Sequence, residues 1–261
     1  MDVTIEFTKS AQENAQSYFE RSKKAKAKAQ GARKSAEDLR SKLEKVEAQS
    51  QERKAMKAVE KREWFEKFNW FFTSAGELAI GGRSAEQNDE LNSKHFDGND
   101  LFFHADIFGA SVAILKDGLD SGEQSREETA QFAASFSKAW ENMQTTVDVY
   151  SLKREQVTKS RNTGSLGTGS FLLKGERQWH KSVPLGLCAF ADEIGAEGRK
   201  RRVVSVVPAI ACANRGIKDF VSLSVGKVKK SDAAKLIAKK LSYDDVDYVM
   251  QHLPTGPFRI D

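Results

Sequence analysis

Apolar and small residues follow a seven-residue repeat through most of the first sixty positions. Steps of four and three residues alternate without a break, which is the register of a coiled-coil seam. Residues 9–47 contain no proline and a single glycine, a composition typical of helices. The seam positions are Ala11, Ala15, Tyr18, Ser22, Ala25, Ala29, Ala32, Ala36, Leu39, Leu43 and Val46. We therefore expect a long coiled-coil helix whose small seam residues need a closely packed second helix.

The repeat ends after Val46, where the next seam positions would be polar or charged. Two interpretations stay open at this point. The helix turns near residues 48–54 and folds back, or it continues with a new apolar face that uses Met56 and Val59.

From Trp64 onward the pattern changes to short apolar runs of the kind that form strands. Six of the nine residues in 64–72 are aromatic, and we assign Trp64, Trp70 and Trp140 to the core. A hairpin is expected around Ser74 to Gly76, and Ser84 is expected to begin a short helix. Further strands are predicted at 100–106, 111–116, 147–152, 169–175, 185–191, 202–209 and 220–226, and helices at 124–142 and 231–241, the last capped by Ser231.

This order of elements predicts an α+β fold. We expect a coiled-coil arm over residues 1–62, a mixed-sheet domain with packed helices over 63–195, and a basic carboxy-terminal extension over 196–261 that contains a small strand-strand-helix unit.

Charged residues are unevenly distributed along the chain. Net charge is +5 for residues 1–63, −9 for residues 64–150 and +9 for residues 151–261. If the chain binds phosphates, the two basic blocks are the parts expected to contact them. Charge alone leaves open whether it does. We predict that RNA binds the carboxy-terminal block, including the run Arg199, Lys200, Arg201 and Arg202.

The sequence lacks the common catalytic motifs. It has no G-x-S-x-G, H-E-x-x-H or G-x-x-x-x-G-K-[ST] pattern, and Cys188 and Cys212 lie in apolar runs typical of buried cysteines. His104 and Asp106 share one side of a strand but have no further ligands nearby, so we expect the imidazole to bond the following turn or to meet RNA. We expect no enzyme activity, no metal and no cofactor. With no signal peptide and no apolar run of about 20 residues, we expect a cytoplasmic protein that does not enter membranes.

Four segments in sequence order resemble the NFACT-R domain of the ribosome-associated quality control factors called NEMF in animals and RqcH in bacteria. The segments are WFEKFNWFF, GGRSAEQN, HADIFGAS and TGSF, within a match from about Trp64 to Ala191. The preceding helix, with DVTIEFTKSAQENA, is similar to the second coiled-coil arm of that family, and the ending is similar to the archaeal extension. Two departures stand out. Phe108 replaces a usual histidine, and RNTGSLGTGS replaces the usual A-P-T-G-E-Y-L-x-x-G-S.

The resemblance implies a non-catalytic factor that binds tRNA and the large ribosomal subunit. Family members recruit charged tRNA, chiefly alanyl-tRNA, for template-free carboxy-terminal tailing of stalled nascent chains. The implied partners also include a separate polypeptide that carries NFACT-N and the first coiled-coil arm, or a second copy of this chain. The alternative is a stand-alone NFACT-R coiled-coil protein that binds RNA or DNA outside that pathway.

The resemblance also implies a set of RNA-contacting residues. The positions that match family motifs are Arg83, Gln87, Asn88, His104, Asp106, Lys159, Ser160, Gly169, Ser170 and Lys174. With Arg177, the cations of this set suit phosphates, and the amides and hydroxyls suit sugar or base edges. A structural interpretation stays open beside it, in which Gln87 or Asn88 caps a helix and Asp106 holds a turn.

Overall fold

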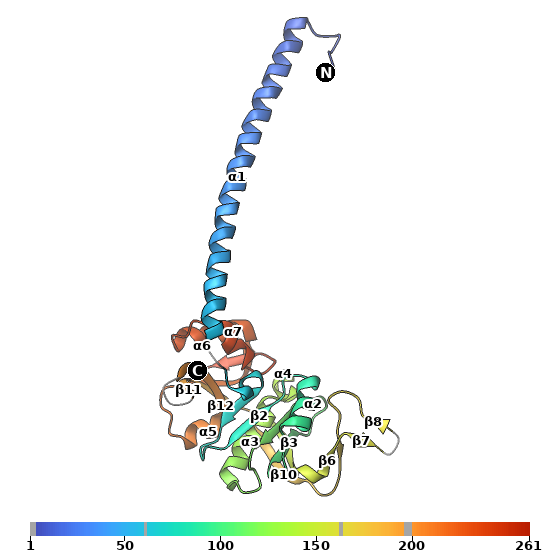
Figure 1. The fold of residues 1–261 in the computed structure, drawn as a ribbon, viewed down its shortest axis with the longest axis vertical. Coiled ribbons are helices and arrows are strands. Elements are labelled where there is room, and N and C mark those ends of the chain that lie inside the picture. Colours follow the sequence, from blue (N-terminus) through green and yellow to red (C-terminus); the bar gives the residue numbers. More distant parts are fainter. Residues whose placement is uncertain (1–3, 60–61, 162–163, 196–199) are drawn as a thin grey trace. The chain divides into compact units, whose positions relative to one another are not determined.

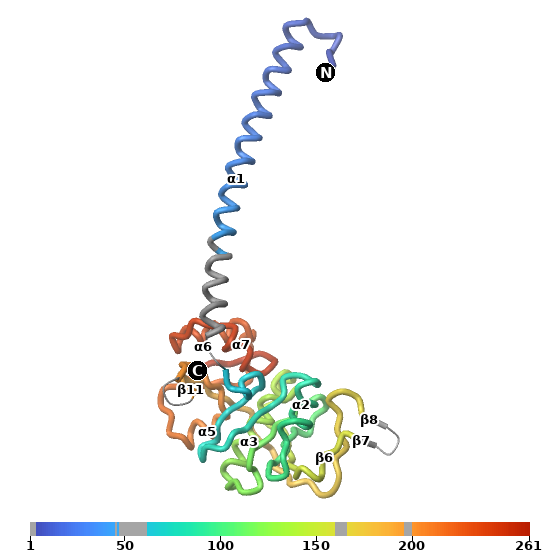
Figure 2. Tube along the Cα trace, viewed as in Figure 1, coloured from blue at the N-terminus to red at the C-terminus, as the bar shows by residue number. Residues whose placement is uncertain are grey.

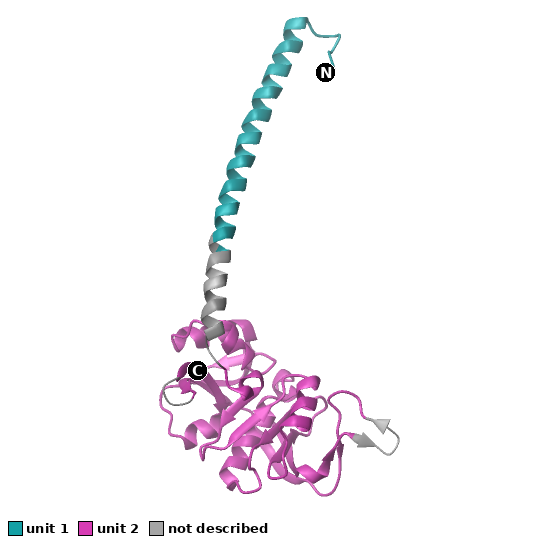
Figure 3. Ribbon diagram, viewed as in Figure 1, with its two compact units in different colours: residues 1–61 teal, residues 62–261 magenta. Residues whose placement is uncertain are grey.

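The computed structural model describes residues 4–59, 62–161, 164–195 and 200–261, without the side chains of 45, 47–59, 160, 161, 164 and 165. The chain divides into two compact units, residues 1–61 and residues 62–261 (Figure 3). The first unit is helical and the second contains all the strands (Figure 1). The predicted α+β class with a long amino-terminal helix is therefore confirmed.

The first unit is built on one helix, α1, over Ala11–Val59, whose amino-terminal part is the blue coil of Figure 2. The helix continues through residues 48–54 without folding back, and the predicted apolar face with Met56 and Val59 lies outside the described side chains. A capping box begins it, because Glu13 N donates to Ser10 Oγ at 3.2 Å and Ser10 N donates to Glu13 Oε2 at 2.7 Å. Asn14 Nδ2 donates to the Glu6 carbonyl at 3.1 Å, which ties the incoming segment to the first turn.

The second unit is built on a six-stranded antiparallel sheet in the order β1-β2-β4-β3-β5-β10. Its strands are β1 Asn69–Phe72, β2 Leu78–Gly81, β3 Leu101–Ala105, β4 Val112–Leu115, β5 Thr146–Lys153 and β10 Gln178–Pro184. The predicted hairpin around Ser74 to Gly76 joins β1 to β2, and Gly76 takes a positive φ of 101° in its turn. The strand β10 was not predicted. It forms the sheet edge and pairs with β5 alone in this order.

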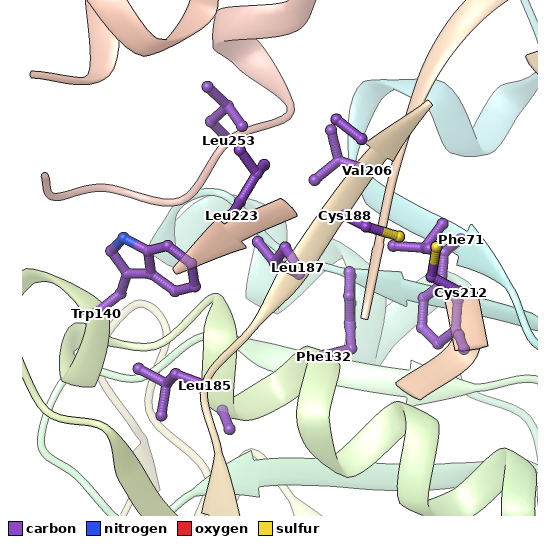
Figure 4. Close-up of a cluster of buried hydrophobic side chains, with 14 of the residues drawn as sticks. Phe71, Phe132, Trp140, Leu185, Leu187, Cys188, Val206, Cys212, Leu223 and Leu253 are labelled. Carbon is purple, nitrogen blue, oxygen red and sulfur yellow. The ribbon is translucent and has the colours of Figure 1, made fainter. Parts of the chain in front are cut away.

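Two layers of side chains cover this sheet. One face packs on helix α3 (Glu123–Ser135) through residues such as Phe103 and Phe132, which belong to the larger apolar core (Figure 4). The other face carries a second apolar cluster that includes Phe102 and Leu91, the latter from helix α2 (Ala85–Lys94). The short 3-10 helix η1 (Trp64–Lys67) adds to this cluster.

The structure corrects the tryptophan assignments in part. Trp70 is 5% exposed and Trp140 is fully buried, so both belong to the core as predicted. Trp64 is 46% exposed and stacks on the ring of His95 at a centroid distance of 4.5 Å. Its assignment to the core was wrong.

A four-stranded sheet in the order β12-β11-β13-β14 completes the second unit. Its strands are β11 Leu187–Ile194, β12 Arg201–Pro208, β13 Val221–Val228 and β14 Phe258–Ile260. The helices that occur along this part of the chain are α5 Ala209–Asn214, α6 Lys230–Lys240 and α7 Val246–Gln251. The predicted boundary between residues 195 and 196 lies inside the β11–β12 hairpin, and both strands belong to the compact unit 62–261.

Several local boundaries differ from the prediction. The helix expected over 124–142 is broken into α3 and α4 (Lys138–Glu141), because the Ser137 hydroxyl accepts from Ala139 N at 3.1 Å and starts a new turn. Helix α6 begins at Lys230, so Ser231 lies inside it and does not cap it. The remaining short elements are η2 Arg154–Gln156, β6 Val157–Thr158, β7 Ser160–Arg161, β8 Gly164–Ser165 and β9 Leu172–Leu173.

Candidate nucleic-acid interface

Three aromatic side chains lie side by side across the strands β3, β5 and β10. His104 is directly opposite Tyr150, and Tyr150 is directly opposite Trp179, so all three project from the same face of the sheet. The ring centroids are 5.6 Å apart for His104 and Tyr150 and 5.5 Å apart for Tyr150 and Trp179. Trp179 at the sheet edge is the most exposed of the three at 39%, Tyr150 is 5% exposed, and His104 is half-buried. We call these three residues the aromatic row.

Hydrogen bonds fix the inner end of the aromatic row. His104 Nε2 lies 3.2 Å from the Ala110 carbonyl, and His104 Nδ1 lies 3.2 Å from the Tyr150 hydroxyl. A carbonyl only accepts, so Nε2 carries the proton and neutral Nδ1 accepts from Tyr150. Burial lowers the pKa of His104, which favours this neutral form. The predicted bond from His104 to the turn is confirmed.

Two cations flank the outer end of the aromatic row. Arg177 directly precedes β10 and Lys181 lies on it, two residues before and two residues after Trp179, and both side chains approach the rings of the row. The Arg177 guanidinium lies 4.4 Å from the Tyr150 ring centroid, and Lys181 Nζ lies 4.1 Å from that of Trp179. Both distances are within the range of cation–π attraction. The row therefore ends in an exposed indole between two positive charges.

Asp148 on β5 positions Lys181. Its carboxylate accepts from Lys181 Nζ at 2.7 Å and from Ser182 N at 2.8 Å. Ser182 has a positive φ of 51°, at the irregularity between His180 and Val183 where the β5–β10 register shifts. The hydrogen bond from Lys181 lowers the pKa of Asp148, so this carboxylate stays charged.

Arg83, Gln87 and Asn88 hold the start of helix α2. Arg83 donates to the Phe68 carbonyl at 2.6 Å and to Asn69 Oδ1 at 3.1 Å, and burial lowers its pKa to about 10. Gln87 Oε1 accepts from Arg83 N at 2.9 Å, and Asn88 Oδ1 accepts from Val112 N at 3.3 Å. Gln87 thus bonds the backbone at the start of α2, close to the capping role of the structural interpretation, whereas Asn88 does not cap the helix and bonds strand β4.

Gly82, a motif glycine just before this helix, is needed for the close packing at this position. A Cβ atom on Gly82 would lie 2.1 Å from Asn88 Oδ1, so only glycine leaves room for that amide. Ser84 caps the helix as predicted, since its side chain accepts from Gln87 N.

Lys159 and Gly169 are tied to helix α2 through Asp89. Lys159 forms an ion pair with the Asp89 carboxylate, and Gly169 N donates to Asp89 Oδ1 at 3.1 Å. Gly169 has a positive φ of 74°, and a Cβ atom there would lie 2.8 Å from Ala85 Cβ. Ser170 and Lys174 are exposed nearby along the chain, while the side chain of Ser160 lies outside the described residues.

The basic run Arg199 to Arg202 extends into the start of β12, and its last two residues bond other parts of the second unit. Arg201 forms an ion pair with Glu66, and the two side chains are 13% and 2% exposed. Arg202 donates to the Leu241 carbonyl at 2.8 Å and to the Ser242 carbonyl at 3.2 Å. Lys200 is exposed, and Arg199 lies outside the described residues. The prediction that this run contacts RNA stays a prediction: Arg201 is held by the buried Glu66 carboxylate, whereas Arg202 is exposed although it bonds two carbonyl oxygens.

From the predicted set, the structure brings His104 and Arg177 together at Tyr150, while Arg83, Gln87 and Asn88 are engaged at the start of α2. Asp106 is exposed just after β3. The sequence interpretation missed Tyr150, Trp179 and Lys181. The alternation Arg177-x-Trp179-x-Lys181 was the available signal, since residues two apart on a strand share a face.

Within the described residues, no three His, Cys, Asp or Glu side chains gather in a way that could hold a metal ion. The same part of the chain has no helix that is both long and apolar enough to cross a membrane. Cys188 and Cys212 are buried and unbridged, and burial raises the pKa of both thiols.

Comparison with known proteins places this surface in a family. Residues 67–175 match the model of the NFACT protein RNA binding domain, so the aromatic row straddles the end of the matched region. The archaeal Rqc2 homolog aRqcH of Methanocaldococcus jannaschii is 32% identical over 77% of this chain and 30% of the relative. The ribosome quality control complex subunit NEMF homolog of Drosophila melanogaster is 34% identical over 70% of this chain and 19% of the relative.

A solved structure was also found, the C-terminal part of the fibronectin/fibrinogen-binding protein from Streptococcus suis. It has a TM-score of 0.40 at 25% identity, over 48% of this chain and 47% of that chain. The chain thus spans less than a third of the length of the two curated relatives. It carries an NFACT-R domain and belongs to the family of NFACT proteins that includes archaeal RqcH and animal NEMF.

Proposed function

We propose that this chain is an RNA-binding part of a ribosome-associated quality control factor. In this role it binds tRNA on the large ribosomal subunit and helps to recruit charged tRNA for template-free carboxy-terminal tailing of stalled nascent chains. The Drosophila relative, named as a ribosome quality control complex subunit, supports the pathway. The ribosome is the site of the proposed activity, so the proposal places the chain in the cytoplasm.

The observation that carries the RNA-binding proposal is the aromatic row with its two flanking cations. Exposed aromatic rings stack on bases, and Arg and Lys beside them neutralise phosphates. Trp179 and Lys181 on the edge strand β10, with Arg177 directly before it, combine these two properties around one exposed indole. Arg83 at the start of α2 has the opposite character, because its guanidinium donates to backbone carbonyls within the fold, whereas the side chain of Lys181 is 63% exposed while paired with Asp148.

We further propose that the chain acts by binding and not by catalysis. His104 is the histidine of the aromatic row, and both its ring nitrogens are engaged. Burial lowers its pKa, so a general-acid role near neutral pH is disfavoured. The proposed function needs neither metal nor cofactor.

Helix α1 is proposed to pair with a second helix. Leu39, Leu43 and Val46 lie on the predicted seam and are 61%, 58% and 62% exposed. A helix with such a seam gains stability when a partner covers it, because isolated helices are marginal in water. The proposed partner is a separate polypeptide that carries NFACT-N and the first coiled-coil arm, and a second copy of this chain takes that place when the protein is purified alone.

Co-sedimentation from cell lysate, with sequencing of the bound RNA, tests the proposed function. We expect the full chain to enter the large-subunit fraction together with enriched tRNA. The double variant Arg177→Gln/Lys181→Gln should lose most of this RNA. The matched control Lys239→Gln/Lys240→Gln, which removes two exposed positive charges from α6, should retain it. Mixed RNA away from ribosomes would contradict the proposal and favour a stand-alone nucleic-acid-binding protein.

A further inference from the structure

Trp179 differs from the other tryptophans of the second unit in what surrounds its ring. Trp70 and Trp140 are buried, and Trp64 is stacked on His95. Trp179 is 39% exposed, and its contact with Tyr150 is edge-to-face, with 68° between the ring planes. The Tyr150 ring is therefore not stacked parallel on the indole, unlike the His95 ring on Trp64.

The indole is also held in a fixed direction. Tyr150, which supports it, is 5% exposed and bonded through its hydroxyl to His104. Lys181 and Arg177 lie 4.1 Å and 5.7 Å from the Trp179 ring centroid. A rigid aromatic ring costs little conformational entropy when a ligand stacks on it.

The flanking charges define the ligand chemistry. Arg177 precedes Trp179 by two residues and Lys181 follows it by two, and their charged groups lie 5.7 Å and 4.1 Å from the centre of the indole ring. In RNA each base is attached to a backbone with a phosphate on either side. An indole with a cation on either side therefore suits a single nucleotide, because the ring stacks on the base while the cations bind the two phosphates. Bases in a duplex are stacked on their neighbours, and only unpaired bases in loops, bulges or single strands expose a face to a side chain.

We propose that Trp179 is the stacking site for one unpaired RNA base, and that Arg177 and Lys181 bind the phosphates on either side of that nucleotide. This inference rests on the proposed RNA-binding function and makes it specific for unpaired nucleotides over duplex. Asp148 contributes by positioning Lys181 through their 2.7 Å ion pair.

Binding of three labelled RNAs to the full chain tests this inference: a hairpin with an unpaired loop, the same hairpin with abasic loop nucleotides, and a blunt duplex of equal length. We expect the unpaired loop to bind tightest. Trp179→Ala should weaken its binding about 10-fold or more, the usual loss for one stacked base, and should leave duplex binding unchanged. Trp179→Phe, which keeps an aromatic face, should retain most of the affinity. The matched control Trp64→Phe alters the other exposed tryptophan and should have no effect.

A second readout reports stacking directly. Saturating loop RNA should quench tryptophan emission in the wild-type chain, and Trp179→Phe should remove that quenching. The inference is overturned while RNA binding stands if Trp179→Ala binds loop and duplex as the wild type does. It is likewise overturned, in favour of a protein partner, if Trp179→Ala loses only its association with intact large subunits and keeps its loop-RNA affinity. Failure of the wild-type chain to bind any RNA would overturn the proposed function itself.

Discussion

Arg201 at the start of β12 forms an ion pair with Glu66 in η1, across 135 residues of sequence. The Glu66 side chain is 2% exposed, and Arg201 also lies 5.9 Å from the Tyr248 ring centroid. The pair thus links the beginning of the second unit to its carboxy-terminal sheet and to α7. Arg201, which the charge distribution of the sequence predicts to contact RNA, therefore stabilises the fold through Glu66.

Arg201→Gln should reduce the free energy of unfolding by about 3 kcal/mol, because it leaves a buried carboxylate without its charge partner. Lys200→Gln, at the exposed neighbouring position, should change it by less than about 0.5 kcal/mol. Urea unfolding followed by circular dichroism measures both. Equal stability of the two variants would show that Arg201 is as free in solution as Lys200.

Gly82→Ala should destabilise the second unit by about 1–3 kcal/mol, because the added methyl group overlaps the Asn88 amide. The hydrogen bond from Val112 N to Asn88 Oδ1 would be displaced as well. Gly98→Ala is the control, since a Cβ atom at Gly98 meets no atom within 4 Å. Thermal unfolding of the two variants should separate them, and a tolerated Gly82→Ala would contradict the close approach.

Stability should decrease as pH falls from 7 to 5. Burial lowers the pKa of His252 from 6.5 to about 3, and burial also lowers the pKa values of His95, His104 and His180. The folded state then stays neutral at pH values where the unfolded chain binds protons, so stability is complete above about 6.5 and is lost below it. For His252 alone we expect a loss of about 1–2 kcal/mol between pH 6.5 and 5.

Urea unfolding at pH 7 and pH 5 measures this effect. His252→Gln removes the titrating ring, so the difference in unfolding free energy between the two pH values should shrink relative to wild type. An unchanged difference would mean that His252 is not held neutral by the fold.

Substitution of leucine for Ala29 and Ala32 should weaken the helix pairing proposed for α1, because larger side chains prevent the close approach of a small-residue seam. The control places the same spacing off the seam, as Ala27→Leu/Gln30→Leu. Light scattering gives the mass and circular dichroism the helicity. A fully helical monomer at micromolar concentration that is indifferent to both pairs of changes would contradict the need for a partner.

Elements with a clear local signal were predictable from the sequence. The Ser74 to Gly76 hairpin, the Ser84 cap and the long helix all follow from turn residues, caps or periodicity, which act over a few positions. Strand β10 was missed because it is an edge strand with mostly exposed positions, so its sequence QWHKSVP lacks apolar alternation.

The candidate site was harder to predict than the fold. His104, Tyr150 and Trp179 are far apart in sequence and meet only through the pairing order β3-β5-β10. Motif positions identified His104, but they also selected Arg83 and Asn88, whose side chains are used in packing. Sequence cannot separate a residue that shapes a domain from one that contacts its ligand, because both uses restrict the residue type.

The most direct test of the account is the salt dependence of RNA binding by the wild-type chain and by Arg177→Gln/Lys181→Gln. If these two cations neutralise phosphates, the slope of log K against log[salt] should become shallower by about 1.4 in the double variant, which is about 0.7 for each lost phosphate contact on a single strand. The charge-matched control Lys239→Gln/Lys240→Gln should keep the wild-type slope. An unchanged slope in Arg177→Gln/Lys181→Gln would contradict the claim that RNA binds at the aromatic row.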